Sequence, residues 1–301
     1  MYARGDLRGA APAGAMAVFV GCRRTRPGVV AVCATALVAS CGVAGANGGA
    51  GRGPAASPGS PVLGYRLNAV AAVPGASAWA VGLSSQGSVH AIRWDGRAWR
   101  PVPAPGGGDL YGVAALSAAD AWAVGYGAGN TALIEHWTGT PWAPVAAPRT
   151  GPGSLHAVAA VSPGDVWAVG VRIGARGTRG LIEHWNGTAW TVVPSPALAK
   201  GGLAGVTVLS ATRAWAVGAT SHRQHRTLTV IERWNGRSWA LVPSPARGYL
   251  AGVTATSARN AWAVGTTGLP LGRGTGIIEH WKGTSWTCIS ATGTAGPCPP
   301  G

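Results

Sequence analysis

The stretch LIEHWNGTAW, Leu181–Trp190, sets a glutamate, a histidine and two tryptophans around an Asn-Gly pair. Taken alone, it fits a catalytic patch, a sugar-stacking platform or the corner of a β-hairpin. Near-copies of the stretch recur along the chain, and this recurrence decides among the three interpretations.

The chain contains five copies of one unit. Each unit has an AWAVG or VWAVG element, followed by a Trp-x4-Trp pair with glycine at its second intervening position. The element tryptophans are Trp79, Trp122, Trp167, Trp215 and Trp262. The pairs are Trp94/Trp99, Trp137/Trp142, Trp185/Trp190, Trp234/Trp239 and Trp281/Trp286, which complete the 15 tryptophans of the protein.

Each unit predicts four strands. In the third unit, Leu155–Ser162 and Val166–Val171 are apolar runs, typical of strands buried on both faces. Leu181–Trp185 leads into Ala189–Pro194 through the Asn-Gly corner, since both corner residues tolerate the positive φ of a tight hairpin turn. Four strands in about 46 residues is the period of a β-propeller blade. We therefore expect a five-bladed β-propeller of four-stranded antiparallel blades over residues 65–290.

The corners resemble a known turn. WDGRAW (Trp94–Trp99), WNGTAW (Trp185–Trp190) and WKGTSW (Trp281–Trp286) resemble the D-x-G-x-x-W turn of Asp-box repeats. The units resemble the blades of extracytoplasmic bacterial β-propellers of the kelch-like and photosystem-assembly-factor type. The box aspartate is replaced by tryptophan or shifted by one position, and the kelch Gly-Gly doublet is missing. The resemblance implies the fold and carries over no binding residue.

The tryptophans are expected to form the core and the contacts between blades, because the same positions recur in every unit. The alternative is that some are exposed and stack on sugars, which would make the protein a secreted lectin. Glutamates also recur in the third strand beside histidine or arginine, where a structural hydrogen bond or ion pair is expected. They are Glu135, Glu183, Glu232 and Glu279.

Residues 1–40 are expected to be an export signal. Arginines precede the apolar run Val29–Ser40, which is too short to span a bilayer. The run ends in LVASC, which resembles the bacterial lipobox and implies that Cys41 is lipidated, anchoring the protein to the outer face of the cytoplasmic membrane. An ordinary secretory signal, cleaved a few residues later, is the alternative. Residues 41–64 are rich in Gly, Ala, Pro and Ser and predict a flexible tether.

The formal net charge of +15 invites a nucleic-acid interpretation. The expected export of the chain argues against it, and so does the scattering of the arginines outside any single run or helical stripe. We expect no nucleic-acid partner.

No catalytic residue is predicted. Glycosidases need two opposed carboxylates roughly 5–10 Å apart, and the first strands of the five units contain none. The nucleophile-elbow sequence is also missing, so a hydrolase is the least favoured alternative. His222 and His225 have a spacing compatible with a metal, but no third ligand is evident, and we expect neither a metal nor a cofactor.

Cys288 and Cys298 remain once the signal and Cys41 are set aside. An even pair in an oxidising compartment predicts a disulfide. This bridge would pin the tail, residues 291–301, against the last blade.

Function is expected on the loops of variable length between the second and third strands, because variable loops on a rigid scaffold commonly carry binding sites. Three successive blades place basic residues there: Arg172, Arg176, Arg179, His222, Arg223, His225, Arg226 and Arg273. We expect this basic face to bind an anionic envelope component, such as a polyanionic polymer, a glycan, lipid headgroups or an acidic protein surface. The alternative is a solvated rim without a partner. The protein would act as a monomeric, non-catalytic binding or scaffolding module.

Overall fold

The computed structural model describes residues 65–299 except 74–76, 85–88, 140, 176, 197–199, 222–226, 268–273 and 290–293. The predicted signal, the tether and Cys41 lie outside these residues. Within the described part of the chain, no helix is long and apolar enough to cross a membrane.

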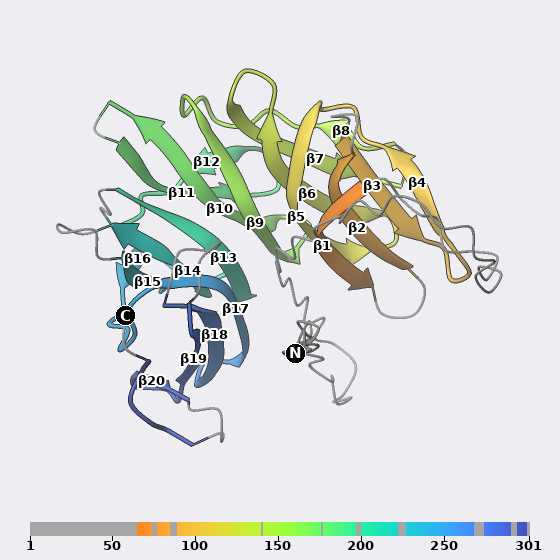
Figure 1. The fold of residues 1–301 in the computed structure, drawn as a ribbon. Helices are drawn as coiled ribbons and strands as arrows, with labels where there is room; N and C mark the ends of the chain where they lie inside the picture. Colours follow the sequence, from red (N-terminus) through yellow and green to blue (C-terminus); the bar gives the residue numbers. More distant parts are fainter. Residues whose placement is uncertain are drawn as a thin grey trace, which may run out of the picture.

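The described residues form five antiparallel sheets of four strands each, called blades 1 to 5 in chain order (Figure 1). In each blade the strands are hydrogen-bonded in the order of the sequence. Blade 1 contains β1 (Tyr65–Val73), β2 (Ser77–Ser84), β3 (Val89–Trp94) and β4 (Trp99–Pro103). Blade 2 contains β5 (Gly108–Ser117), β6 (Asp120–Gly127), β7 (Thr131–Trp137) and β8 (Ala143–Pro144). Blade 3 contains β9 (Gly153–Ser162), β10 (Asp165–Gly174), β11 (Gly177–Trp185) and β12 (Trp190–Val192). Blade 4 contains β13 (Gly201–Ser210), β14 (Arg213–Ser221), β15 (Thr227–Trp234) and β16 (Trp239–Leu241). Blade 5 contains β17 (Tyr249–Ser257), β18 (Asn260–Thr266), β19 (Gly276–Trp281) and β20 (Trp286–Cys288).

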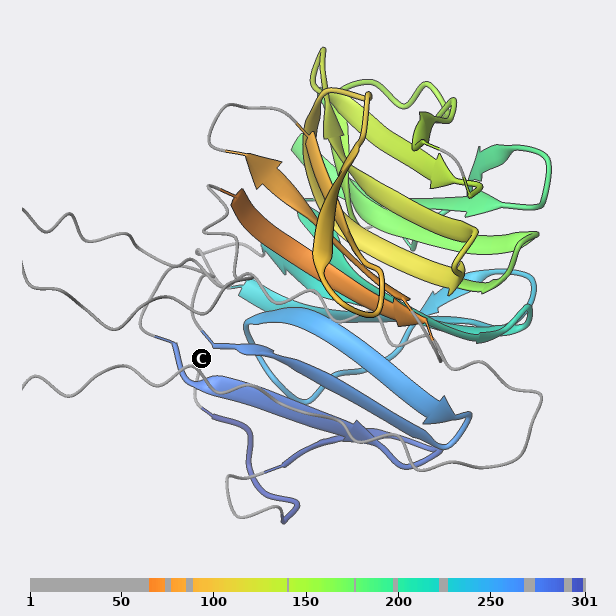
Figure 2. The same ribbon diagram turned by 90° about the vertical axis from the view of Figure 1, so that its right-hand side faces the viewer.

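The core lies between blades, which stack through their faces (Figure 2). Successive side chains of a strand point to opposite faces of its sheet. Each blade therefore has a forward face, turned to the next blade, and a rear face, turned to the preceding one. On β6, Trp122 and Val124 belong to the forward face and pack with Val158 and Trp190 of blade 3. An apolar strand with two buried faces is what this stacking requires.

The tryptophans are packing residues, as the repeat predicts. Ten of the fifteen are buried, five are half-buried and none is exposed. Trp122 illustrates the arrangement, since its ring centroid lies 5.1 Å from that of Trp185 and 5.4 Å from that of Trp190 in the next blade. Tilted and edge-on pairs of this kind add about 0.5–1.5 kcal/mol beyond the area that they bury.

The Asn-Gly corner differs from the predicted two-residue turn. Gly187 has a φ of 95°, whereas Asn186 is not among the residues with positive φ. The Asn186 side-chain oxygen instead accepts hydrogen bonds from the N–H groups of Thr188 and Ala189, both at 3.0 Å. Asp95 accepts the same pair of bonds in blade 1. Asn235 does the same in blade 4, so in these three blades the first corner residue contributes a side-chain acceptor and the glycine contributes its backbone conformation.

The predicted five-bladed propeller does not form a closed ring. The five blades follow one another along an open arc, from blade 1 at the right of Figure 1 to blade 5 at the lower left. Among the described residues, extensive contacts join each blade to the next, and none of comparable extent joins blade 1 to blade 5. The repeat pattern determines the strands and the contact surfaces of a blade. Closure depends on the angle between successive blades, which this pattern does not encode.

The end of the chain is attached to blade 5. Cys288 of β20 forms a disulfide with Cys298, and the N–H of Gly296 donates to the carbonyl of Cys288 at 3.1 Å. The described part of the tail therefore lies along the outer edge of this blade.

Candidate functional site

The segment predicted as a loop between the second and third strands of blade 3 is mostly a hairpin. β10 and β11 continue their pairing through Arg172 with Arg179, Ile173 with Thr178 and Gly174 with Gly177. Directly opposed residues on antiparallel strands have Cβ atoms about 4.5–5.5 Å apart. The hairpin therefore places the side chains of Arg172 and Arg179 beside each other.

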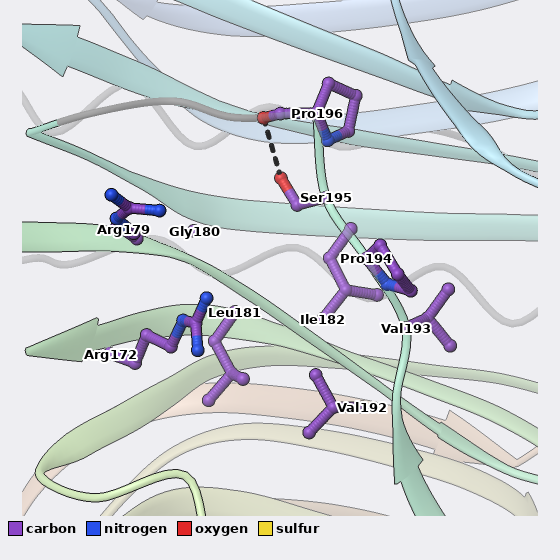
Figure 3. A pocket seen from close by; sticks show the side chains of 10 residues that line it. All are labelled: Arg172, Arg179, Gly180, Leu181, Ile182, Val192, Val193, Pro194, Ser195 and Pro196. Atoms are coloured by element: carbon purple, nitrogen blue, oxygen red, sulfur yellow. Dashed lines mark hydrogen bonds between the residues drawn. The ribbon is translucent and has the colours of Figure 1, made fainter. Parts of the chain in front are cut away.

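A cavity of about 220 Å³ lies beside this arginine pair. Arg172 and Arg179 line one side, and the segment 192–196, which leads out of blade 3, lines another (Figure 3). Leu181 and Ile182 complete an apolar wall. The cavity thus combines two guanidinium groups with a mainly aliphatic surface.

The arginine pair has no described counter-ion. Arg172 is exposed and Arg179 is half-buried, and neither belongs to an ion pair formed by described residues. The Ser195 hydroxyl, on the cavity lining, already donates to Glu232 at 2.7 Å. Like charges directly opposite each other on two strands are destabilising. An anion between the two guanidinium groups would relieve this repulsion.

The arginine pair occurs in blade 3 and not at the equivalent positions of the other four blades. The positions equivalent to Arg172, two residues after the AWAVG glycine, are Ser84, Gly127, Thr220 and Thr267. The positions equivalent to Arg179, six residues before the first tryptophan of the pair, are Ser88, Thr131, Leu228 and Thr275. A residue that recurs in every blade is explained by the needs of the fold. The other four blades form the same sheet without this arginine pair, so the fold does not require it.

The other residues of the predicted basic face lie outside the described residues. They are Arg176, His222, Arg223, His225, Arg226 and Arg273. The structure brings Arg172 and Arg179 together and does not place the rest. Across the described ranges, there is no group of three or more His, Cys, Asp or Glu side chains that could hold a metal ion.

The recurring glutamates form a buried row between the blades. Glu135, Glu183, Glu232 and Glu279 are all fully buried. Burial raises the pKa of Glu183 to about 8 and that of Glu232 to about 7, although the hydrogen bond from Ser195 partly opposes the shift at Glu232. These groups are therefore shielded from any substrate and serve the packing of the blades.

Three of the four glutamates are bonded by the segment that leads in from the preceding blade. Ser195 donates to Glu232 and Ser244 to Glu279, both at 2.7 Å. The N–H of Gly106 donates to Glu135 at 2.6 Å. The role of these serines was not predicted from the sequence. The repeated PSP motif, which contains Ser195 and Ser244, was the signal that could have shown it.

The third-strand histidines are also structural. His136 lies 2.9 Å from Asp120, and its ring stacks on Trp122 with the centroids 3.8 Å apart. His184 repeats this arrangement in blade 3, with its Nε2 atom 2.8 Å from Asp165. The aspartates of the repeat thus orient histidines against tryptophan rings.

No protein-family model matches the chain, and no curated protein matches it in sequence. Solved structures do share its architecture. A fucose-specific fungal lectin from Aleuria aurantia, described as a six-bladed β-propeller, has a TM-score of 0.50 and 14% identity over 76% of this chain and 79% of the lectin. The SapL1 lectin, in complex with α-methyl fucoside, has a TM-score of 0.50 and 13% identity over 75% of this chain and 77% of the lectin.

The fold is that of a β-propeller. At such low identity the likeness concerns the fold alone. The lectin fold is six-bladed, which corrects the prediction of a complete five-bladed propeller, since the five four-stranded blades of the described residues form an open arc. YCF48 bound to D1 peptide is also similar, with 16% identity over 79% of this chain and 88% of that chain, at a TM-score of 0.35.

Proposed function

We propose that this propeller is a non-catalytic binding module of the cell envelope that holds an anionic group of an envelope component between Arg172 and Arg179. The observation that carries the proposal is the arginine pair itself, held in register at the edge of a cavity of about 220 Å³ without an acidic partner among the described residues. Guanidinium groups present paired donors that match the oxygens of carboxylates and phosphates.

The proposed ligand group is a phosphate or carboxylate joined to a short apolar body. The two arginines would take the anion, and Val192, which lines the cavity and is 43% exposed, would contact the apolar part. A lectin that stacks sugars on tryptophan is not favoured, because none of the fifteen tryptophans is exposed.

The non-catalytic character is supported by the state of the carboxylates. The four glutamates are buried between blades, and Asp120 and Asp165 are engaged by histidines. Glycoside hydrolysis needs two carboxyl groups that reach the same bond. These six of the eight described acidic groups are committed to the fold.

The envelope location rests on the predicted export signal and on lipidation of Cys41. The diacylglyceryl group that lipidation would add to Cys41 has two acyl chains, which together would hold the propeller at a membrane surface. Metabolic labelling with a radioactive fatty acid tests this part, since Cys41→Ala should abolish the label. A labelled Cys41→Ala variant would contradict the anchor.

Binding is tested with the full chain and two polymeric probes, a poly(glycerol phosphate) and a polyuronate, with dextran as a neutral glycan. Reversal of both charges (Arg172→Glu with Arg179→Glu) should weaken binding to one or both polyanions by at least about tenfold, because two charge-assisted hydrogen-bonding groups are lost. The matched control reverses two exposed arginines on other corners, Arg213 and Arg237. It changes the net charge equally and should keep the wild-type affinity.

Two results would overturn the proposal. An equal loss of binding in both double variants would mean that only the overall positive charge attracts the polymer. Binding of the wild-type chain to neither polyanion, or preferential binding to dextran, would reject the anion site.

A further inference from the structure

The contact between successive blades is the same at each of the four junctions. A valine on the second strand, from the forward face of one blade, packs in the same apolar cluster as a valine on the first strand of the next. The pairs are Val81 with Val113, Val124 with Val158, Val169 with Val206, and Val217 with Val253. All eight side chains are at most 4% exposed. Each junction therefore consists of two complementary half-surfaces.

The two ends of the arc each carry one half-surface without its complement. Val264, the forward-face valine of blade 5, is 37% exposed, and Val70, the first-strand valine of blade 1, is 52% exposed. Beside them, Ile278 of blade 5 and Leu67 of blade 1 are each 39% exposed. The residues equivalent to these two in the interior of the arc are buried: Leu110, Leu155, Leu203 and Leu250 for Leu67, and Ile134, Ile182 and Ile231 for Ile278.

The tryptophans at the two ends of the arc also differ from those at the interior junctions. Trp79, Trp122, Trp167 and Trp215 each contact the tryptophan pair of the following blade. Trp262 of blade 5 is half-buried, and the ring that it contacts among the described residues is that of His280, 3.8 Å away in its own blade. In blade 1, Trp94 and Trp99 contact each other and are half-buried.

The terminal blades of this arc lack the expected caps. In repeat proteins the terminal units carry a polar outer face that keeps the end in solution. The ends here retain the apolar side chains of the interior junctions. On blade 1 the open strip follows β1, since Ala80 and Ile92 on the same face are buried.

We propose that a second copy of this chain covers these ends, with blade 1 of one copy docked on blade 5 of the other. Leu67 and Val70 of one chain would pack against Trp262, Val264 and Ile278 of its neighbour. The occupant follows from the structure, because the four interior junctions show which surface each half accepts. Such a head-to-tail contact is heterologous, so copies add until the assembly closes on itself. This inference is independent of the proposed function.

Sedimentation velocity of the full chain over a wide range of concentration tests the contact. The wild-type protein should form species of two or more chains. Val70→Arg removes the blade 1 half and Val264→Arg removes the blade 5 half, so each variant alone should sediment as a single chain. The Val70→Arg variant keeps an intact blade 5 surface, and the Val264→Arg variant keeps an intact blade 1 surface. Mixed in equal amounts, the two variants should therefore form dimers and nothing larger. Leu241→Arg, at an outer-strand residue 51% exposed, is the matched control and should assemble like the wild type.

Other outcomes would overturn the inference. A wild-type chain that stays single at all concentrations would mean that its own residues cover the ends or that the arc closes within one molecule. Assembly that survives either substitution, or that the mixture does not restore, would exclude a head-to-tail contact. Circular dichroism of each variant shows that the strands are intact, and both valines are exposed enough for arginine to be accommodated without disturbing the fold.

Discussion

The hydroxyl of Ser195, which follows blade 3, donates a 2.7 Å hydrogen bond to the buried carboxyl group of Glu232 in blade 4. The bond crosses a junction between blades and satisfies one oxygen of a fully buried side chain. Ser244 and Glu279 repeat it at the next junction. Ordinary turn residues between blades thus contribute to holding neighbouring sheets together.

Removal of this hydroxyl should destabilise the protein. Ser195→Ala leaves a buried carboxyl oxygen without its donor, and we expect the free energy of unfolding to fall by about 1–3 kcal/mol. Since the Ser195 bond lowers the pKa of Glu232, the variant should also raise that pKa. Urea denaturation measures the first effect. Ser238→Ala, at an exposed corner residue, is the control, and equal losses in both variants would contradict the assignment.

The equivalent glutamate of blade 3, Glu183, lacks the hydroxyl donor that Glu232 and Glu279 have. Val145, Val193 and Val242 occupy equivalent positions, each donating its N–H to the third strand of its own blade at 2.9 Å. Two residues further on stand Ala147, Ser195 and Ser244. Glu183, which would receive the bond from position 147, has no hydrogen-bond partner for either carboxyl oxygen within the described structure.

Ala147→Ser should therefore stabilise the protein. The added hydroxyl can donate to Glu183, and a net gain of about 1 kcal/mol is expected from one such bond. Thermal unfolding, compared with Ala189→Ser at an exposed corner position, measures the effect. A lowered melting temperature for Ala147→Ser alone would show that the hydroxyl does not reach the carboxyl group.

Burial of the glutamates should make the folded protein less stable as the pH rises. Burial raises the pKa of Glu183 from 4.5 to about 8 in the folded state. As pH rises above about 4.5, the unfolded chain releases this proton first, so stability falls until about pH 8 and then levels off. Below pH 4.5 both states hold the proton and the loss is absent.

Glu183→Gln removes this titration. The variant should be more stable than the wild type at pH 8, by an amount on the order of a few kcal/mol, and the difference should shrink towards pH 4.5. Urea midpoints measured between pH 4 and 9 test this. A difference that does not change with pH would mean that the carboxyl group is already ionised in the folded protein.

Position along the arc should decide what a tryptophan contributes. Trp122→Ala removes a fully buried ring that contacts two tryptophans of the next blade, and a loss of about 3–5 kcal/mol is expected. Trp262→Ala removes a half-buried ring at the open end and should cost clearly less. The two urea denaturation curves, recorded at low protein concentration, compare them directly. Equal losses would contradict the open end of the arc.

The sequence predicted the blades well because their determinants are local. Apolar runs, the corner glycines such as Gly187 and the recurring tryptophans each specify a strand, a turn or a packing position within one unit. The disulfide of Cys288 with Cys298 follows from counting cysteines. The open arc did not follow, because it depends on small angles between blades that add up along the chain.

The candidate site was predicted only in part. A run of mixed Gly, Arg and Thr from Val171 to Gly180 has the composition of a loop, and the pairing of Arg172 with Arg179 became visible only once β10 and β11 were seen to continue into it. The basic residues were recognisable in the sequence, but the register that makes two of them neighbours was not.

The disulfide between β20 and the tail should influence the end of the molecule from which unfolding starts. Loss of structure in a row of stacked units starts at an end, and at the carboxyl-terminal end the disulfide keeps the tail hydrogen-bonded along the edge of β20. Fraying should then advance from blade 1. A protease would first release fragments from the amino-terminal side, leaving the later blades as the last resistant piece.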